Sequence, residues 1–206
     1  MVKLMSKKNL FKRELFNQYS IRLIKSLKKI SSNDVYRLYE KLYEAWKNSK
    51  TIYICGNGGS AGNSNHIAND LLFAAGKKNK KGLKVESLAS NQSVITCLAN
   101  DIGYQNIYSE QIRVKGNKDD LLILLSGSGN SQNIINAIKA SKKCKMFTFG
   151  LFGFDGGKSK KIVDDFIHFK VKDMQIAEDL QMIVFNMCIQ KLMKKKINKK
   201  NEKKKF

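Results

Sequence analysis

Two stretches of the sequence share one pattern, TIYICGNGGS at Thr51–Ser60 and LLILLSGSGNS at Leu121–Ser131. Each begins with a short apolar run and ends in glycines with hydroxyl or amide side chains. A helical spacing of apolar residues follows each loop. Buried strand, glycine loop and helix in succession is the repeating unit of α/β proteins with a parallel sheet. We therefore expect both loops at the carboxyl edge of one sheet, where such proteins bind ligands.

The rest of the chain extends this alternation. Further strands are predicted at Leu83–Leu88, Met146–Leu151 and Phe166–Val171, and helices at 61–75, 92–100, 105–115, 132–143, 157–163 and Ala177–Lys194. This predicts an α/β fold, a three-layer αβα sandwich with a five-stranded parallel sheet.

Two amphipathic helices precede the first strand. Apolar residues recur about every four positions over 9–30, and Ser31 is a candidate cap for the helix that ends near Trp46. We expect a helical hairpin over 1–48 that belongs to the same unit as a main domain at 49–194. The lysine-rich segment 195–206 has no apolar periodicity and is predicted to be a disordered tail.

Composition favours a soluble globular protein. The chain has 206 residues, of which 42% are hydrophobic and 27% charged. No apolar stretch approaches the roughly 20 residues that span a bilayer, and the basic N-terminus lacks the features of a secretory signal. The four cysteines are far apart and form no CxxC. A cytoplasmic protein without a membrane partner is expected.

The formal net charge is +22, from 39 Lys and Arg against 17 Asp and Glu. Lysines dominate this excess and gather at the two ends, whereas specific nucleic-acid readers rely on arginine. We attribute the charge mainly to compositional bias and solubility, and expect no specific nucleic-acid partner. A functional attraction to anions is the alternative.

Both glycine loops suit an anion. Glycines let the backbone approach a ligand, and the helix that follows offers free amides and its positive end. Three hydroxyls and two glycines in the second loop form a plausible phosphate cradle that needs no lysine. Neither loop has a dinucleotide-binding or Walker pattern. Each alone could be a simple turn, but two at strand ends favour a binding site.

His66 and Asp70 are four residues apart in a predicted helix and share one face. Such a pair could ligate a metal ion or exchange protons with a substrate. The alternative is a hydrogen-bonded pair on the helix surface. The other histidine, His168, lies in a predicted strand and is expected to be structural or exposed.

Five segments follow in the order found in the sugar isomerase (SIS) domain: GNGGSAGNSNHIAND (56–70), CLANDIGY (97–104), LLSGSGNSQNIINAIKAS (124–141), GFDGGKS (153–159) and AEDLQMIVF (177–185). Within that superfamily the chain resembles the phosphoheptose isomerases over roughly residues 10–194. Those enzymes convert sedoheptulose 7-phosphate to a heptose 7-phosphate for lipopolysaccharide or surface glycans. The resemblance implies the SIS fold and a cytoplasmic homotetramer with sites at subunit boundaries.

The resemblance also implies roles for individual residues. It places the phosphate at Ser60, Ser126, Gly127, Ser128 and Ser131, and the sugar near Asn57, Gly58, Gly59, Asn63, Asp101 and Gln181. It implies Asp70 as catalytic base, Glu178 as a second active-site acid, and His66, Asp70 and Gln181 as zinc ligands. Ile189 departs from the pattern, because the family has a histidine there as last zinc ligand and catalytic acid. Zinc binding is accordingly expected to be weak or absent.

Two functions follow as alternatives. The first is an aldose–ketose isomerase that acts on a phosphorylated sugar. The second is a non-catalytic SIS-domain protein that binds a sugar phosphate, like the regulator that associates with the bacterial replication initiator. Ile189 favours the second alternative. The presence of His66, Asp70 and Gln181 favours the first.

Overall fold

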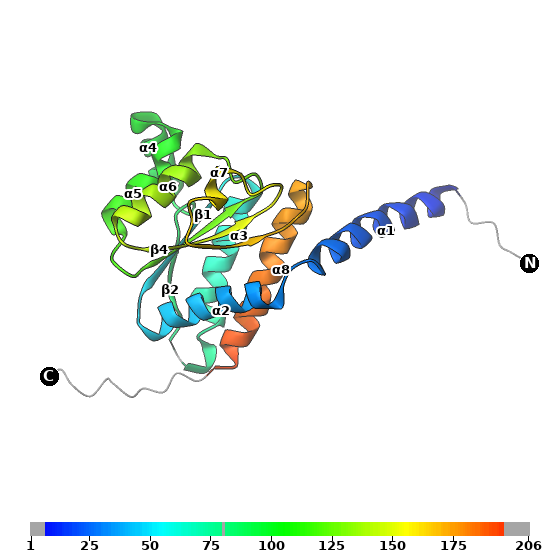
Figure 1. Cartoon of the computed structure of the whole chain (residues 1–206), viewed down its shortest axis with the longest axis horizontal. Helices are drawn as coiled ribbons and strands as arrows, with labels where there is room; N and C mark the ends of the chain where they lie inside the picture. The colour runs from blue at the N-terminus through cyan, green and yellow to red at the C-terminus, as the bar shows by residue number, and fades with distance from the viewer. Residues whose placement is uncertain (1–6, 80, 196–206) are drawn as a thin grey trace, which may run out of the picture.

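The sheet has five parallel strands, as predicted. The computed structural model describes residues 7–79 and 81–195 (Figure 1). The strands lie in the order β2-β1-β3-β4-β5. In chain order they are β1 (Thr51–Gly56), β2 (Lys84–Ser87), β3 (Leu121–Ser126), β4 (Phe147–Phe152) and β5 (Asp165–His168).

Helices cover both faces of this sheet, which confirms the three-layer sandwich (Figure 1). One face packs against α2 (Ser32–Lys47), α3 (Gly59–Asn69) and α8 (Met174–Met193). The other packs against α5 (Ile107–Lys115) and α6 (Gln132–Lys143), with α4 (Gln92–Ile102) outside them. Strand β1 supplies both cores in alternation: Ile52 and Ile54 join the first cluster, Tyr53 and Cys55 the second.

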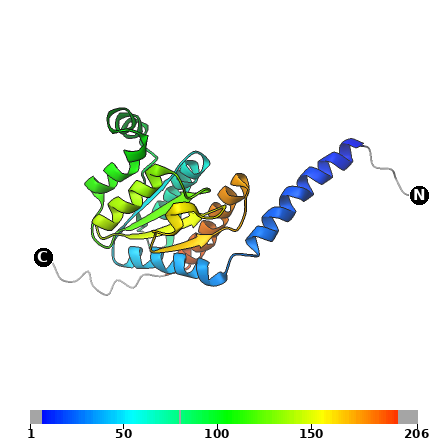
Figure 2. The same cartoon turned by 45° about the horizontal axis from the view of Figure 1, so that its top comes forward.

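The N-terminal helices are present, but they are not arranged as a hairpin. Ser31 caps α2, as predicted, by accepting a hydrogen bond from the Asn33 amide. Helix α1 (Lys7–Leu27) points away from the body instead of lying along α2 (Figures 1 and 2). It is attached by its C-terminal half, where the Tyr19 hydroxyl donates to Asp179 at 2.6 Å and Leu23 and Leu27 pack against the core. The apolar face of the rest of α1 therefore has no partner among the described residues.

Element boundaries differ from the sequence prediction by a few residues at several places. Helix α8 begins three residues earlier, at Met174, because Asp173 caps it by accepting from the Ile176 amide at 3.2 Å. Strand β5 ends at His168. The helix predicted at 157–163 is a single turn, α7 (Gly157–Lys160). The predicted tail from residue 196 onward lies outside the described residues.

The described helices include none that is long and apolar enough to cross a membrane. The four cysteines are free thiols. Burial raises the pKa of the Cys188 thiol to about 12, and it raises the pKa of Cys55 still further. Neither of these two thiols is therefore a nucleophile at neutral pH.

Candidate active site

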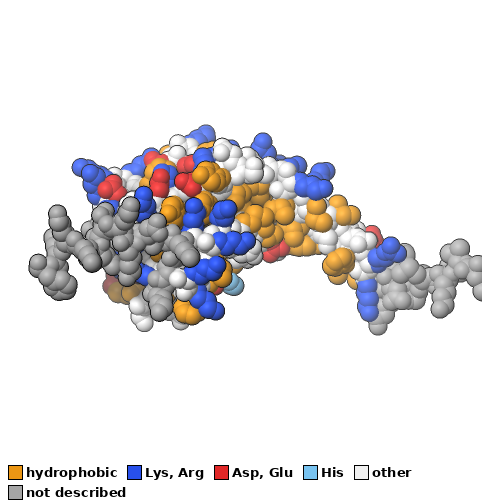
Figure 3. All heavy atoms as spheres, turned by 90° about the horizontal axis from the view of Figure 1, so that it is seen from below, with side chains coloured by type: hydrophobic (Ala, Val, Ile, Leu, Met, Phe, Trp, Pro, Cys, Tyr) orange, Lys and Arg blue, Asp and Glu red, His pale blue; other side chains and the backbone are white. Residues whose placement is uncertain are grey.

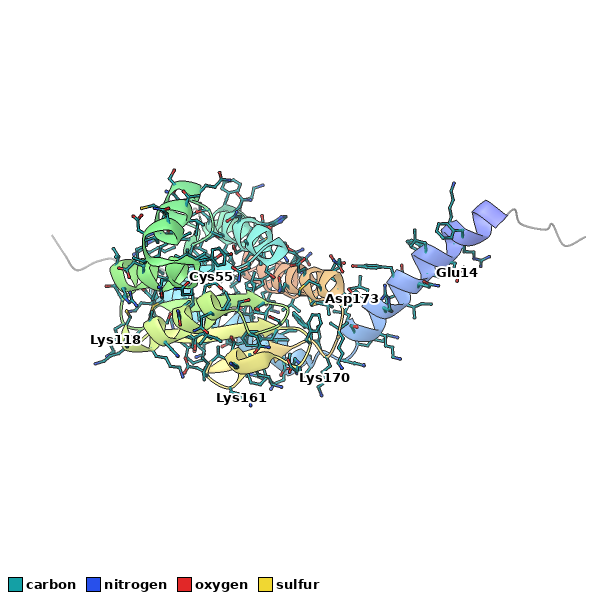
Figure 4. The ribbon with its side chains drawn as sticks, turned by 90° about the horizontal axis from the view of Figure 1, so that it is seen from above. Glu14, Cys55, Lys118, Lys161, Lys170 and Asp173 are labelled. Atoms are coloured by element: carbon teal, nitrogen blue, oxygen red, sulfur yellow. The ribbon has the colours of Figure 1, made fainter. Side chains whose placement is uncertain are left out.

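The two glycine loops lie side by side. Strands β1 and β3 are neighbours, and Gly56 pairs with Leu125 at their carboxyl ends. In Figure 4 the region of the site can be found from two labelled residues: Cys55, which precedes the first loop, and Asp173, at the start of α8. The Tyr108 hydroxyl donates to the Gly56 carbonyl and holds the end of β1 in place. The sequence pattern predicts both loops at one edge of the sheet, and the strand order makes them neighbours.

The serine loop after β3 folds back on itself at the start of α6. The Ser126 hydroxyl accepts from the Gly129 amide at 3.0 Å, and the Ser128 hydroxyl accepts from the Asn130 amide at 3.2 Å. Ser131 occupies the N-cap position of α6, but its side chain makes no capping hydrogen bond. Its hydroxyl and the first amides of α6 remain available to an anion.

The segment 153–159 holds the serine loop in place by hydrogen bonds. The Ser159 amide donates to the Gly129 carbonyl at 2.9 Å, and the Lys158 amide donates to the Asn130 side chain at 3.0 Å. Gly129 has φ +66°, and a Cβ there would lie 2.0 Å from the Gly156 carbonyl oxygen. Sequence reasoning did not assign Gly129 or Asn130 a role, although the GFDGGKS motif marks the supporting segment.

Four of the predicted residues meet where α3 packs on α8. The Gln181 side chain is fully buried, and its amide nitrogen donates to the Ser60 hydroxyl at 3.2 Å. Asn63 donates to the Gln181 amide oxygen at 2.9 Å and to the Glu178 backbone carbonyl at 3.0 Å. The Ser60 hydroxyl also lies 3.5 Å from a Glu178 carboxylate oxygen. These contacts fix the first loop against α8.

Glu178 lies directly against the beginning of α3. A Cβ at Gly59 would be 2.3 Å from one Glu178 carboxylate oxygen. The carboxylate can therefore occupy this position only because residue 59 has no side chain. The positive end of a helix attracts a carboxylate placed there. The second predicted acid therefore lies at the mouth of the first loop, next to Ser60.

Asn57 belongs to a polar cluster that sequence reasoning missed in part. Its side chain exchanges two hydrogen bonds with Asn133 of α6, at 2.9 Å and 2.8 Å. It also accepts from the Tyr104 hydroxyl at 3.0 Å. Asn133 and Tyr104 lie within two of the quoted motifs, but nothing in the sequence indicates that they meet Asn57.

His66 and Asp70 form a pair at the other end of α3. Their side chains approach to 3.3 Å, with His66 59% exposed and Asp70 26% exposed. A π-helical turn (Asp70–Ala74) begins at this point. At about 1.5 Å of rise per residue, the pair lies roughly 9–15 Å along α3 from Ser60. Within one chain the predicted base is therefore well separated from the first loop.

The residues of one chain do not fit a four-ligand zinc site. Both polar atoms of the Gln181 amide are engaged by Ser60 and Asn63. Ile189 is 4% exposed and packs in the apolar core. Among residues 7–79 and 81–195, no group of three His, Cys, Asp or Glu side chains is placed to hold a metal ion.

The remaining predicted residues lie outside this cluster. Asp101 is exposed on α4, where its carboxylate accepts from Cys97 at 3.4 Å and Asn100 at 2.8 Å. His168 is partly buried at the end of β5, and one of its ring nitrogens lies 2.9 Å from the Phe154 carbonyl oxygen.

A hollow of about 700 Å³ lies at the opposite edge of the sheet, near the amino ends of β1, β3 and β4. Its charged side chains pair with each other: Lys50 lies 3.6 Å from Asp119, and Lys142 lies 3.8 Å from Asp164. It contains none of the motif residues. The carboxyl edge, with its two loops and buried polar contacts, is the better candidate site.

Known proteins resemble this chain in sequence and in fold. The profile of the SIS domain family matches residues 15–153. Phosphoheptose isomerase of Helicobacter pylori strain P12 is 35% identical over 171 residues, which cover 82% of this chain and 86% of that protein. Phosphoheptose isomerase of Clostridium acetobutylicum is 39% identical over 127 residues, which cover 62% and 64%.

Solved structures agree with the fold. Phosphoheptose isomerase from Neisseria gonorrhoeae superposes with a TM-score of 0.80 at 24% identity, covering 88% of this chain and 98% of that one. The enzyme from Francisella tularensis gives 0.84 at 21% identity, covering 91% and 99%. The family profile, the curated relatives and the loops at the carboxyl edge lead to one assignment: the chain belongs to the SIS domain family, among the phosphoheptose isomerases.

Proposed function

We propose that this protein is an aldose–ketose isomerase that interconverts sedoheptulose 7-phosphate and a heptose 7-phosphate. The observation that supports it most is the serine loop at the start of α6, next to the Ser60–Glu178 cluster. The loop offers hydroxyls and helix amides to a phosphate, and the cluster offers a carboxylate beside it. The names of the relatives in Helicobacter pylori and Clostridium acetobutylicum supply the reaction.

The chemistry needs a base, a donor for the oxygen that becomes negative, and a group that moves the hydroxyl proton. In the proposed roles, the Asp70 carboxylate removes a proton from one of the two carbons C1 and C2, and the electron pair forms the C=C bond of an enediol. The Asn57 amide donates to the developing oxyanion. Glu178 transfers the hydroxyl proton between the two oxygens, and Asp70 returns its proton to the neighbouring carbon.

Exchange of the C2 proton tests this proposal. The heptose 7-phosphate is incubated with the protein in deuterated water, and deuterium at C2 is followed by NMR. Incorporation together with formation of the ketose supports the isomerase. A protein that binds the sugar phosphate but exchanges no proton would instead be the non-catalytic binding protein that Ile189 favours.

Replacing Ser128 or Ser131 by alanine should weaken sugar-phosphate binding about tenfold or more. Each change removes a hydroxyl at the start of α6, and hydrogen bonds to charged groups are worth roughly 1.5–3 kcal/mol. Calorimetric titration measures the dissociation constant, with Ser20→Ala on α1 as the control. An unchanged dissociation constant in both loop variants would place the phosphate elsewhere.

Self-association would complete the site. The His66–Asp70 pair and the first loop lie at opposite ends of α3, so a second copy of the chain would have to bring the two parts together. Large apolar side chains are available for this contact. Figure 3 shows hydrophobic side chains along α1 and the adjoining body. The exposed large apolar residues include Phe11, Leu15, Phe16, Leu72 and Phe73, each more than half exposed. We propose a homotetramer, as the family resemblance implies.

Phe16→Glu should lower the oligomeric state. Phe16 is 71% exposed on the unpartnered face of α1, so a carboxylate there would oppose burial between copies. Light scattering at micromolar concentration measures the mass, with Asn17→Glu, which adds the same charge on another side of α1, as the control. A wild-type mass of 23.4 kDa would contradict the proposed assembly.

Two finer expectations belong to this proposal. The free thiols agree with a reducing cytoplasm, where the product would supply lipopolysaccharide or surface glycan synthesis. Zinc binding is proposed to be weak or absent, and no step above depends on it. The buried Ile189 and the engaged Gln181 amide support this proposal.

A further inference from the structure

The cluster around Asn57 joins three segments that are far apart in the sequence. Asn57 follows β1, Asn133 lies in the first turn of α6, and Tyr104 follows α4. Asn133 is buried, whereas Tyr104 is 53% exposed. The cluster thus extends from the helix end that forms the phosphate cradle to the open rim of the site.

The direction of every hydrogen bond in this cluster is fixed. The Ile134 backbone N–H donates to the Asn133 side chain at 2.9 Å, so the atom that receives it must be the amide oxygen. The Asn133 amide nitrogen therefore faces Asn57 and donates to its oxygen at 2.8 Å. The Tyr104 hydroxyl meets the same oxygen, at 3.0 Å, and must donate as well.

This polarity determines what the cluster can still offer. The side-chain oxygen of Asn57 accepts two hydrogen bonds. The side-chain nitrogen of Asn57 has two N–H groups, and one of them donates to Asn133. One N–H donor of Asn57 remains. The Tyr104 hydroxyl has given its proton to Asn57, so only its acceptor lone pairs remain. A donor and an acceptor are left in neighbouring positions at the rim.

We propose that Tyr104 is a substrate-binding residue that, with Asn57, recognises hydroxyls of the sugar. A sugar hydroxyl can accept from the Asn57 N–H, and the same or the next hydroxyl can donate to the Tyr104 oxygen. Asn133 is the positioning residue that orients both groups. The proposal rests on the proposed function, because it takes the ligand to be a phosphorylated polyhydroxy sugar. It places the hydroxyls near α6, where Asn133 lies.

This pair would separate a sugar phosphate from a phosphate alone. Inorganic phosphate would bind at the serine loop, but it has no sugar hydroxyls that could contact the Asn57 N–H and the Tyr104 oxygen at the rim. A sugar with a methylene in place of the hydroxyl would leave the Asn57 N–H and the Tyr104 lone pairs without partners. Tyr104 therefore contributes to the choice of sugar and not to the affinity for phosphate.

Tyr104→Phe tests the proposal, because it removes one oxygen from an exposed side chain. We expect KM and the dissociation constant for sedoheptulose 7-phosphate to rise about three- to tenfold, as for the loss of one hydrogen bond. The dissociation constant for inorganic phosphate and the melting temperature should be unchanged. Tyr36→Phe is the matched control, since Tyr36 is similarly exposed on α2, far along the chain from both loops.

Two results would overturn the assignment. An unchanged dissociation constant for the sugar phosphate would show that Tyr104 makes no substrate contact. A parallel loss of affinity for inorganic phosphate would show that the hydroxyl supports the loop instead of the sugar. Failure of the proposed function would be a different result, in which the wild-type protein binds the sugar phosphate but does not isomerise it. A selective effect of Tyr104→Phe on binding would still support the inference in that case.

Discussion

Replacing Asp70 by asparagine should abolish C2 proton exchange while sugar-phosphate binding persists. Asparagine keeps the size of the side chain and can still accept from His66, which now lies 3.3 Å from the carboxylate. It cannot accept a proton from carbon. General acid–base groups contribute about 10²–10⁴-fold to a rate, so kcat should fall by that factor. The phosphate is proposed to be held by the serine loop, so the dissociation constant should change little.

The experiment compares exchange rates by NMR with dissociation constants by calorimetry. Glu44→Gln, on α2 at the opposite edge of the sheet, removes a carboxylate without touching the proposed site and should leave both unchanged. If Asp70→Asn retained full exchange, Asp70 would not be the base. Glu178, next to Ser60, would then be the first residue to test in its place.

Gly129→Ala should damage both the fold and ligand binding. The backbone at Gly129 has φ +66°, and an added Cβ would lie 2.0 Å from the carbonyl oxygen of Gly156. That neighbour is backbone and cannot rotate away. Left-handed strain of about 1–2 kcal/mol adds to an overpacking cost of about 1–3 kcal/mol. For a domain of this size, a loss of about 3 kcal/mol lowers the melting temperature by roughly 6–12 °C.

The serine loop should lose its shape in the same variant, because the Ser126 hydroxyl accepts from the Gly129 amide. Sugar-phosphate affinity is expected to fall more than tenfold, since several donors move together. Gly62→Ala is the matched control: Gly62 is in α3, and a Cβ there meets nothing within 4 Å. It should stabilise slightly, by about 0.5–1 kcal/mol. Equal melting temperatures in the two variants would contradict this description of the loop.

The fold could be predicted because its signals are local. Apolar runs that end in glycine loops predict β1 and β3, and Ser31 predicts the start of α2 as its N-cap. The start of α8 was missed, although Asp173 precedes Ile176 at the spacing of a cap. The course of α1 could not be predicted. Its apolar spacing indicates burial, but the structure gives most of that face no partner among the described residues.

The site was predictable only where one segment contains the chemistry. The serine loop and the His66–Asp70 pair each lie within a few residues, and the structure forms both. The contacts of Asn57 with Asn133 depend on β1 lying beside β3, which is a property of the strand order and not of either motif. The burial of Ile189 likewise follows from how α8 packs on the sheet.

The π-helical turn at Asp70 has a consequence for the position of the proposed base. The Ala75 amide donates to the Asp70 carbonyl at 3.0 Å, a ring that contains one residue more than an α-helical turn. The Leu71 carbonyl accepts from the Leu83 amide at 3.1 Å, so the widened turn also connects the helix to the segment before β2. The widened turn therefore ends α3 and leads the chain towards β2. Asp70 is the first residue of this turn, so a change in the turn would move the carboxylate of the proposed base relative to His66.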